Sequence, residues 1–504
     1  MTRYQMERGK AGTGAVLSLD AIGKQDDYLL GKESFFKYRP REHTNFSSYY
    51  NRYEVLKPGD DTGWPFTKKI AFKLNPKTSG DLIAGMYLRF TLPAIIQNPD
   101  EPIVGSIDNI FYSKNVGYAA IKEVKFEVEG EEFEKLTTDY MILHKELYSS
   151  DSEENSINNL VNNGNTRIEP VFEADYPLTC YVPLPFFFTR KRDKGIQDDY
   201  RPYFFLSACY NQEVRVVVEF NPITFFTGQL VNKSPSGDKI PQGLFRLITM
   251  DKVTLVTEEI LLSPEERHHY LTTKQLSVID VSSRNPSATY VKNPDIIPNN
   301  PFGGYGSQSV QTDSTTTTQY FKTQLINSNM VKAIHWFFRN IDFTEINNTT
   351  FTAGFVNRFN FSNNLIKIDT SLDDITFFPE NLYPIMAEAS IQINGAQMLS
   401  FTGMSSVRKD WRGFGSDYYK YVESYKSDFR TPEKNIYTYS FSLDPRKMYP
   451  SGSLNFGALD SQKTLIDGSL LQGVAANTYV METYYIETRF LKYENGFCSL
   501  FFST

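Results

Sequence analysis

The stretch Lys122-Glu-Val-Lys-Phe-Glu-Val-Glu-Gly130 alternates apolar and charged side chains with a period of two. Successive side chains of an extended strand point to opposite faces, so Val124, Phe126 and Val128 share one face and the charges share the other. The glycine at position 130 then marks a turn. The stretch therefore predicts a β-strand with one buried face, followed by a turn.

Similar signatures recur on both sides of this stretch. Glu213–Phe220 contains three consecutive valines, which is typical of a strand in the core of a sandwich. Ile436–Leu443 alternates again, and its pattern predicts one apolar face and one polar face, namely Tyr437, Tyr439, Phe441 and Leu443 against Thr438, Ser440 and Ser442. Glycine turns follow Val128 and Ile393, a weak echo between the two halves that favours a duplicated β-unit.

The composition favours the same fold class over the whole chain. Aromatic residues make up 15% of the 504 residues, mostly Phe (39) and Tyr (32), and these suit a pleated, half-buried surface. A chain of this length exceeds one ordinary core and fits two all-β domains of roughly 200–250 residues each. We therefore predict an all-β protein with two domains.

A helix start separates the two predicted domains. Ser263-Pro264-Glu265-Glu266 combines an N-cap serine, a proline at the first helical position and acids in the first turn. We expect this helix to end near Leu271 and place the boundary there. The predicted division is an N-terminal arm (1–24), a first domain (25–262), a linker helix (263–274) and a second domain (275–504), with a long polar loop at Ser282–Gln319.

Charge, cysteine content and hydropathy exclude several classes of protein. A net charge of −7 argues against direct binding of nucleic acid, which usually requires a basic surface. The three cysteines (Cys180, Cys209 and Cys498) form no C-x-x-C pair, and so sparse a set is typical of a reducing compartment. The sequence contains no run of 18 apolar residues, so we expect no membrane-spanning helix. The polar start at Met1–Lys10 does not resemble a secretory signal.

Residue patterns that carry catalytic or metal chemistry are missing from the sequence. The five histidines (His43, His144, His268, His269 and His335) contain no H-E-x-x-H pair and are too scattered for a metal-binding cupin. We expect His268 and His269 on a helix surface and His335 within a strand. The basic cluster Arg190-Lys191-Arg192 is predicted to be a solvated loop rather than a phosphate site. We therefore predict no catalytic, cofactor-binding or metal-binding residues, and no enzyme activity.

Six segments, in order, resemble the major capsid proteins of nucleocytoplasmic large DNA viruses of the iridovirus, phycodnavirus and marseillevirus types. They are Phe35-Phe-Lys37 with His43-Thr-Asn-Phe46, Asn115–Val124 (similar to that family's first conserved strand), Tyr181-Val-Pro-Leu-Pro-Phe186, Glu213-Val-Arg215, Ile436–Pro445 and Tyr449-Pro-Ser-Gly-Ser-Leu-Asn-Phe456. Together they span about residues 15–490.

The resemblance implies two tandem eight-stranded jelly rolls joined by a short helical linker. It also implies a homotrimer with a pseudo-hexagonal outline that contacts neighbouring capsomers and minor capsid proteins. Contact with an inner membrane would be indirect, through minor proteins. The expected location is the virion shell, assembled in the host cytoplasm. The alternatives are a minor capsid paralogue, a scaffold of the same fold, or a carbohydrate-binding jelly-roll protein.

Overall fold

The computed structural model describes residues 45–55, 69–93, 107–113, 115–162, 172–173, 177–190, 202–222, 225–231, 234–236, 251–286, 289–291, 320–340, 359, 361, 384–400, 414–470 and 479–501. The chain divides into two compact units, Met1–Phe46 and Ser47–Thr504, and nearly all described residues belong to the second. The predicted N-terminal arm and His43 lie outside the described residues, as do Lys191 and Arg192.

The elements before residue 262 are mainly strands. The strands are β1 (Ser47–Glu54), β2 (Lys69–Leu74), β3 (Leu82–Leu92), β4 (Ile107–Tyr112), β5 (Ile121–Val128), β6 (Glu131–Thr137), β7 (Phe172–Glu173), β8 (Leu178–Pro183), β9 (Phe204–Phe205), β10 (Val214–Phe220), β11 (Thr227–Val231), β12 (Ser234–Ser236) and β13 (Asp251–Leu261). The helices are α3 (Val116–Ala119), α4 (Thr138–Tyr148), α5 (Asp151–Leu160) and the 3-10 turn η1 (Leu206–Cys209).

The helix α6 (Pro264–Thr272) separates these elements from a second group of strands. The strands are β14 (Gln275–Arg284), β15 (Thr289–Val291), β16 (Tyr320–Gln324), β17 (Met330–Asn340), β18 (Met386–Ile393), β19 (Ala396–Ser400), β20 (Ile436–Ser440), β21 (Leu454–Asn455), β22 (Leu465–Leu470), β23 (Tyr479–Glu494) and β24 (Phe497–Phe501). One helical run comprises α7 (Phe414–Asp417), the π-helical turn η6 (Tyr418–Val422) and α8 (Glu423–Lys426), and a 3-10 turn η7 (Phe456–Ala458) follows later.

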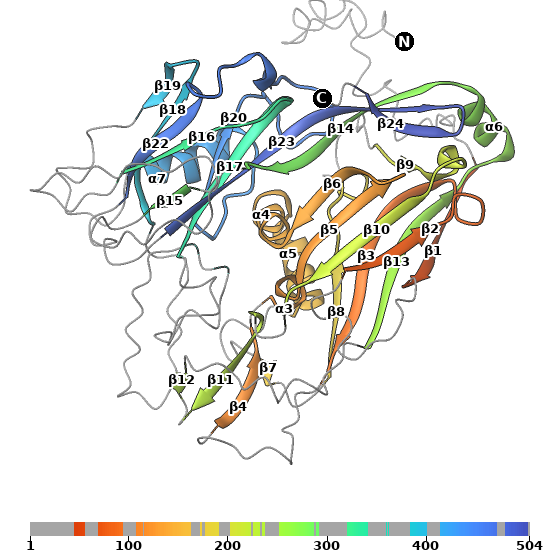
Figure 1. Ribbon diagram of the computed structural model, residues 1–504, viewed down its shortest axis with the longest axis horizontal. Coiled ribbons are helices and arrows are strands. Elements are labelled where there is room, and N and C mark those ends of the chain that lie inside the picture. The colour runs from red at the N-terminus through yellow and green to blue at the C-terminus, as the bar shows by residue number, and fades with distance from the viewer. Residues whose placement is uncertain are drawn as a thin grey trace, which may run out of the picture. The chain divides into compact units, whose positions relative to one another are not determined.

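The two main sheets of each group of strands share one topology (Figure 1). The first group has main sheets in the orders β1-β13-β3-β8 and β2-β10-β5-β6, and the second has β14-β23-β17-β20 and β16-β22-β18-β19. The first group has a further sheet, in the order β12-β11-β4-β7. If the eight strands in the two main sheets of each group are numbered 1 to 8 in chain order, the sheets of both groups have the strand orders 1-8-3-6 and 2-7-4-5. The all-β prediction is confirmed, and the weak echo in the sequence corresponds to a repeated arrangement of strands.

The strand predicted from residues 122–130 is β5, and its side chains alternate as expected. Val124 and Phe126 are fully buried, and Val128 is 1% exposed. The ring of Phe126 lies at the centre of an aromatic cluster, with centroids 4.7–6.4 Å from five neighbours (Phe133, Phe186, Phe187, Phe188 and Phe204). This cluster forms much of the core between the sheets of the first group.

The predicted glycine turns close two equivalent hairpins. Glu129 and Gly130 join β5 to β6 with φ values of 50° and 85°, and Asn394 and Gly395 join β18 to β19 with 51° and 80°. Positive φ at both central residues defines the type I′ turn, whose twist matches that of paired strands.

Gly130→Ala should test this turn. No atom lies within 4 Å of an added Cβ, so the cost comes from the left-handed backbone alone. We expect a loss of about 1–2 kcal/mol in the free energy of unfolding, measured by urea titration. Gly130→Asn should lose less, because asparagine tolerates this conformation. Equal losses in both variants would contradict the turn assignment.

The predicted helix at Ser263 is confirmed. The Ser263 hydroxyl accepts a hydrogen bond from the Glu266 backbone N–H at 3.3 Å, and Pro264 occupies the first position of α6. His268 and His269 are exposed on this helix, as expected.

Two predicted segments are corrected by the structure. Residues 115–119 do not begin a strand, because Asn115 adopts a left-handed conformation (φ 52°) and caps the short helix α3, so that β5 starts only at Ile121. The predicted loop at Ser282–Gln319 is wrong at its start, because Ser282–Arg284 pair with β23 as part of β14, while residues 292–319 lie outside the described residues. Polar residues favoured a loop there, yet the sheet continues, and a further strand, β15, follows.

The prediction for Ile436–Leu443 is partly wrong. Tyr437 is fully buried as expected, and Tyr439 and Phe441 pack against the same core. However, Thr438 is also fully buried, and Leu443 is 90% exposed. The strand ends at Ser440, and both faces of β20 are covered, so a simple inside–outside alternation does not apply.

Glu259 holds the edge strand β1 in place. This carboxylate, fully buried on β13, accepts hydrogen bonds from the hydroxyls of Tyr49 (2.8 Å) and Tyr53 (2.6 Å) on β1. The backbone N–H of Gly80 (2.6 Å) and the hydroxyl of Thr257 (2.8 Å) also donate to it. Several neutral donors of this kind can hold a buried carboxylate without a cation.

Candidate functional site at the junction between the two groups of sheets

The sheet β14-β23-β17-β20 is buried on both faces. One face closes the core of the second group of strands. The other, which we call the outer face, contributes Phe337, Ile436 and Tyr484 to a core shared with residues of the first group. Thr438, His335 and Tyr484 form one cross-strand row on this outer face. Helix α4 contacts the row directly, and we call this contact region the junction.

Helix α4 is positioned by the strands that precede it. The Thr137 hydroxyl caps its first turn by accepting a hydrogen bond from the Tyr140 N–H (3.2 Å), and the Thr138 hydroxyl donates to the Ile121 carbonyl of β5. The Thr137 hydroxyl also lies 2.8 Å from the Tyr484 hydroxyl on β23. One capping residue therefore both starts the helix and contacts the opposite sheet.

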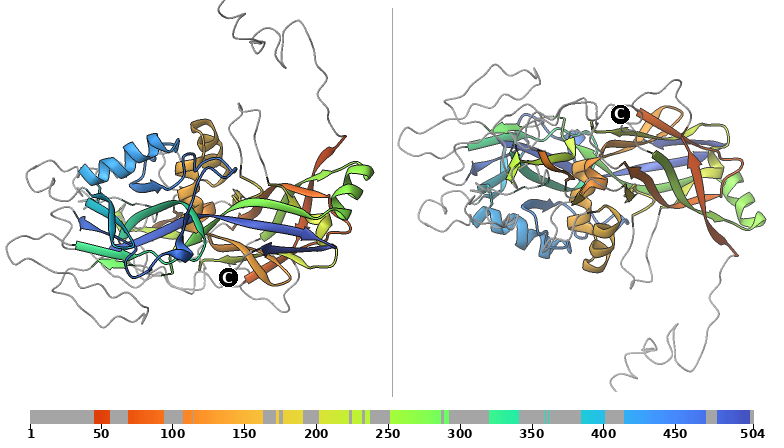
Figure 2. Two further views of the ribbon diagram at one scale, coloured as in Figure 1. Left: turned by 90° about the horizontal axis from the view of Figure 1, so that it is seen from above. Right: turned by 90° about the horizontal axis from the view of Figure 1, so that it is seen from below.

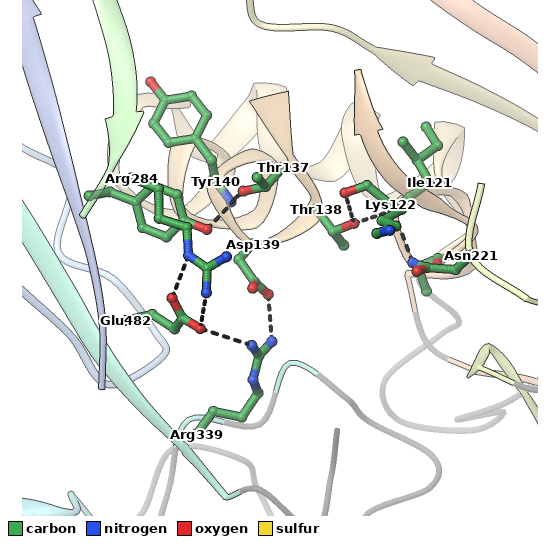
Figure 3. Close-up of polar contacts among 12 residues, drawn as sticks. Ile121, Lys122, Thr137, Thr138, Asp139, Tyr140, Asn221, Arg284, Arg339 and Glu482 are labelled. Carbon is green, nitrogen blue, oxygen red and sulfur yellow. Dashed lines mark hydrogen bonds and ion pairs between the residues drawn. The ribbon is translucent and has the colours of Figure 1, made fainter. Parts of the chain in front are cut away.

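A chain of four charged side chains crosses the junction (Figure 3). Asp139 in the first turn of α4 binds the Arg339 guanidinium at 2.7 Å, and Arg339 lies 3.7 Å from Glu482. Glu482 in turn accepts two hydrogen bonds from Arg284, at 2.6 and 2.7 Å. Alternating charges of this kind fix the position of the helix on the sheet, because shifting either element would leave a part-buried charge unpaired.

A second ion-pair group lies deeper in the junction. Glu134 of β6 pairs with Arg190, which also donates to the Asp280 carbonyl of β14 at 2.7 Å. The carboxylate of Asp280 binds Lys332 of β17 at 2.7 Å, and the Lys332 side chain is fully buried. Burial raises the pKa of Glu134 and of Asp280, while the neighbouring cations act in the opposite direction.

Arg190 is therefore not part of a solvated loop, as its basic neighbours suggested. Its residue exposure is only 8%, and its guanidinium joins the two groups of sheets. The sequence prediction was wrong for this residue because a run of basic residues gives no information on which of them meets a buried carboxylate.

The two histidines of the junction lie in surroundings that disfavour their charged form. His335 Nε2 lies 3.0 Å from the Tyr148 hydroxyl, and the His144 ring stacks on Tyr148 with centroids 5.0 Å apart. Burial lowers the pKa of His335 to about 3. Burial, followed by the charges of Arg190 and Arg446, lowers the pKa of His144 well below its usual value.

The stability of the protein should fall in acid because of these histidines. An unfolded histidine titrates near pH 6.5, whereas folded His335 stays neutral until about pH 3. Between these values the unfolded chain binds the extra proton, so the free energy of unfolding decreases as the pH falls below 6.5. The slope should be about 1.4 kcal/mol per pH unit for each such histidine.

The measurement is the free energy of unfolding at several pH values between 6.5 and 4. His335→Gln should have a shallower slope than the unchanged protein. His268→Gln, at an exposed position of α6, is the matched control and should leave the slope unchanged. Identical slopes in all three proteins would show that His335 does not titrate as its burial implies.

The junction attaches the two groups of sheets to each other through paired charges and packed rings. Its carboxylates are paired with cations, and His335 is fully buried. Across the described ranges, no group of three or more His, Cys, Asp and Glu side chains could hold a metal ion. Within the same residues, no helix is long and apolar enough to span a membrane. The three cysteines are buried free thiols.

The repeated arrangement of strands defines a double jelly-roll protein, and solved structures of this class match the chain over nearly its whole length. The solved chain of PBCV-1 VP54 matches with a TM-score of 0.64 at 17% identity, covering 94% of this chain and 100% of its own. The Faustovirus major capsid protein matches with a TM-score of 0.62 at 12% identity, covering 95% and 97%.

Sequence comparison places both halves in one family. Residues 34–238 match the model of the major capsid protein N-terminus, and residues 305–478 match that of the large eukaryotic DNA virus major capsid protein. The chain therefore belongs to the family of major capsid proteins of large eukaryotic DNA viruses.

Two curated relatives support this assignment. Capsid protein 1 of Acanthamoeba polyphaga mimivirus is 27% identical over 274 residues, which is 51% of this chain but only 41% of the relative. The major capsid protein of Phaeocystis pouchetii virus is 23% identical over 97% of this chain and 99% of its own length.

Proposed function

We propose that the chain is a structural subunit of a viral shell and has no enzymatic activity. Three copies associate as a homotrimer with a pseudo-hexagonal outline, which contacts neighbouring capsomers and minor capsid proteins. The proposed division of the chain is the arm (1–24), two jelly rolls (25–262 and 275–504) and the linker between them. The observation that carries the proposal is the repeated topology in one chain, since three such chains present six similar sandwiches.

The junction supports this proposal. A shell subunit must keep its two sandwiches in a fixed arrangement so that neighbouring copies meet the same surfaces each time. Two ion-pair groups and a shared aromatic core achieve this here. We further propose that the chain makes no direct contact with nucleic acid, reaches an inner membrane only through minor proteins, and assembles into virions in the host cytoplasm.

Light scattering of the purified full chain tests the oligomeric state. We expect a mass of about three times 57.9 kDa at micromolar concentration. A monomer under these conditions would contradict the proposal. A minor capsid paralogue or scaffold of the same fold remains the alternative, and protein staining of purified particles separates the two, because a major capsid protein dominates the stain.

A further inference from the structure

Two of the three cysteines lie at one place, although they are far apart in the sequence. Cys209 is the last residue of the turn η1 in the first group of strands, and Cys498 lies on β24, at the end of the second group. In Figure 1 and in both views of Figure 2, the hairpin of β23 and β24 extends from the second group of strands toward α6. There it packs on η1, and the two elements have Cα atoms within 8 Å of each other.

One side chain holds the backbone of Cys498 against the end of η1. Gln212 Oε1 accepts a hydrogen bond from the Cys498 N–H at 2.5 Å, and Gln212 Nε2 donates to the Cys498 carbonyl at 3.1 Å. The Gln212 backbone N–H donates to the Cys209 carbonyl at 2.9 Å. The two cysteines are therefore connected by hydrogen bonds through a single residue.

The turn that precedes Cys498 is seated on the same loop. Asn495 and Gly496 join β23 to β24 with φ values of 53° and 84°. Their carbonyls accept hydrogen bonds from Asn211, at 3.3 Å from its side-chain amide and at 3.2 Å from its backbone N–H. A Cβ added at Gly496 would lie 2.5 Å from the Tyr210 ring, so the turn has no room to move closer to this loop.

The two thiols share one buried environment. Cys209 is fully buried and Cys498 is 1% exposed, and both belong to the same core. The Cys209 thiol lies 3.6 Å from the Phe205 carbonyl and is also a hydrogen-bonding neighbour of the Cys498 thiol. Burial, followed by this neighbour, raises the pKa of Cys498. The third thiol, Cys180, lies apart on β8, where the Asn162 amide contacts it at 3.2 Å.

We propose that Cys209 and Cys498 form a modification site, at which a low-molecular-weight disulfide oxidises the two thiols to an intramolecular disulfide. The bond joins η1 of the first group of strands to β24 of the second and closes a loop of about 290 residues. Within the described residues, no group of three or more metal-ligating side chains includes this pair, which favours a cross-link over a metal site.

The exchange needs only the two thiols and the small disulfide. Opening of β24, which in the described part of the chain pairs only with β23, exposes Cys498. Its thiolate attacks one sulfur of the small disulfide, whose S–S bond breaks, and the other half leaves and takes up a proton. The Cys209 thiolate then attacks the Cys498 sulfur and releases the second half as a thiol. Two protein thiols lose two electrons and two protons, and one small disulfide becomes two thiols.

The cross-link stabilises the folded protein, because it restricts the unfolded chain. The chain folds with its thiols reduced, as its sparse cysteines indicate, and the bond forms once the protein leaves a reducing compartment. This timing rests on the proposed function, since a shell protein leaves the cell within the virion. The cross-link itself depends only on the two thiols.

Incubating the purified full chain with glutathione disulfide, without denaturant, tests the proposal. We expect the mass to fall by about 2 Da and a digest without reductant to yield one linked pair of peptides, containing Cys209 and Cys498. The melting temperature should rise by about 5 °C above that of the reduced protein. Cys180→Ala is the control and should behave identically. Cys209→Ala should instead keep glutathione on Cys498, because it lacks the thiol that completes the exchange.

Three results would overturn the inference: two free thiols after prolonged incubation, glutathione retained on the unchanged protein, or a link that includes Cys180. Light scattering of the same samples keeps the proposed function separate. A trimer that forms no cross-link overturns the inference and leaves the proposed function standing. A monomer that forms the cross-link supports the inference and contradicts the proposed function.

Discussion

Arg190→Met should lower the free energy of unfolding by about 3–5 kcal/mol, one of the largest losses expected for a single substitution in this protein. The Glu134 side chain has no solvent exposure, and Arg190 is the cation that pairs with it. Removing the guanidinium leaves a buried carboxylate without a cation. Glu134 then either stays charged, held only by hydrogen bonds from the Phe187 and Ser282 backbone N–H groups and the Ser282 hydroxyl, or takes up a proton. The variant also loses the hydrogen bond to the Asp280 carbonyl on the opposite sheet.

A double-mutant cycle separates the pair from its surroundings. Glu134→Gln combined with Arg190→Met should recover part of the loss, because no unpaired charge then remains. Lys69→Met provides the comparison for an exposed pair: Lys69 binds Glu219 at 3.2 Å, but its side chain is 61% exposed, so less than about 1 kcal/mol should be lost. Urea unfolding of Arg190→Met, Glu134→Gln, the double variant and Lys69→Met gives the comparison, and additive losses in the double variant would argue against a coupled pair.

The features that the sequence predicted correctly depend on neighbours along the chain. The alternation in residues 122–130 correctly predicts which side chains lie on each face of β5, because successive side chains of a strand point to opposite faces. The Ser263-Pro264 signature reports the start of α6 for the same reason, since the cap and the first turn are adjacent in sequence. Glycine at position 130 likewise determines a turn locally.

The features that it missed depend on contacts between distant segments. The outer face of β20 looked polar because Thr438 and Ser440 lie there, yet α4, some 290 residues earlier, covers that sheet. Arg190 looked solvated because its buried partners lie on β6 and β14. Similarly, nothing local distinguishes Asp139 as the partner of Arg339, which lies 200 residues away.

The junction as a whole could not be predicted for this reason. Its residues are individually ordinary: a capping threonine, a helix-start aspartate, one buried histidine and one half-buried histidine. A single sequence predicts that such residues occur on helices or strands, but not which faces pack together. The resemblance to capsid proteins predicted two similar sandwiches, and only the structure identifies the side chains that join them.

Phe126→Ala should lose about 3–5 kcal/mol in the free energy of unfolding. The ring is fully buried and lies within 6.4 Å of five other phenylalanine rings, so its removal leaves a cavity that rigid neighbours cannot readily fill. Of the three apolar positions read from the alternation of β5, this one has the largest side chain.

Lys125→Ala is the matched control for this strand. Lys125 precedes Phe126 on the opposite face, where its side chain is 23% exposed and pairs with Glu132 at 2.7 Å. Losing this pair should cost no more than about 1 kcal/mol. Chemical unfolding of both variants measures the difference, and the yield of soluble protein should follow the same order. A loss at Lys125 equal to that at Phe126 would mean that β5 does not place one face in the core and the other toward solvent.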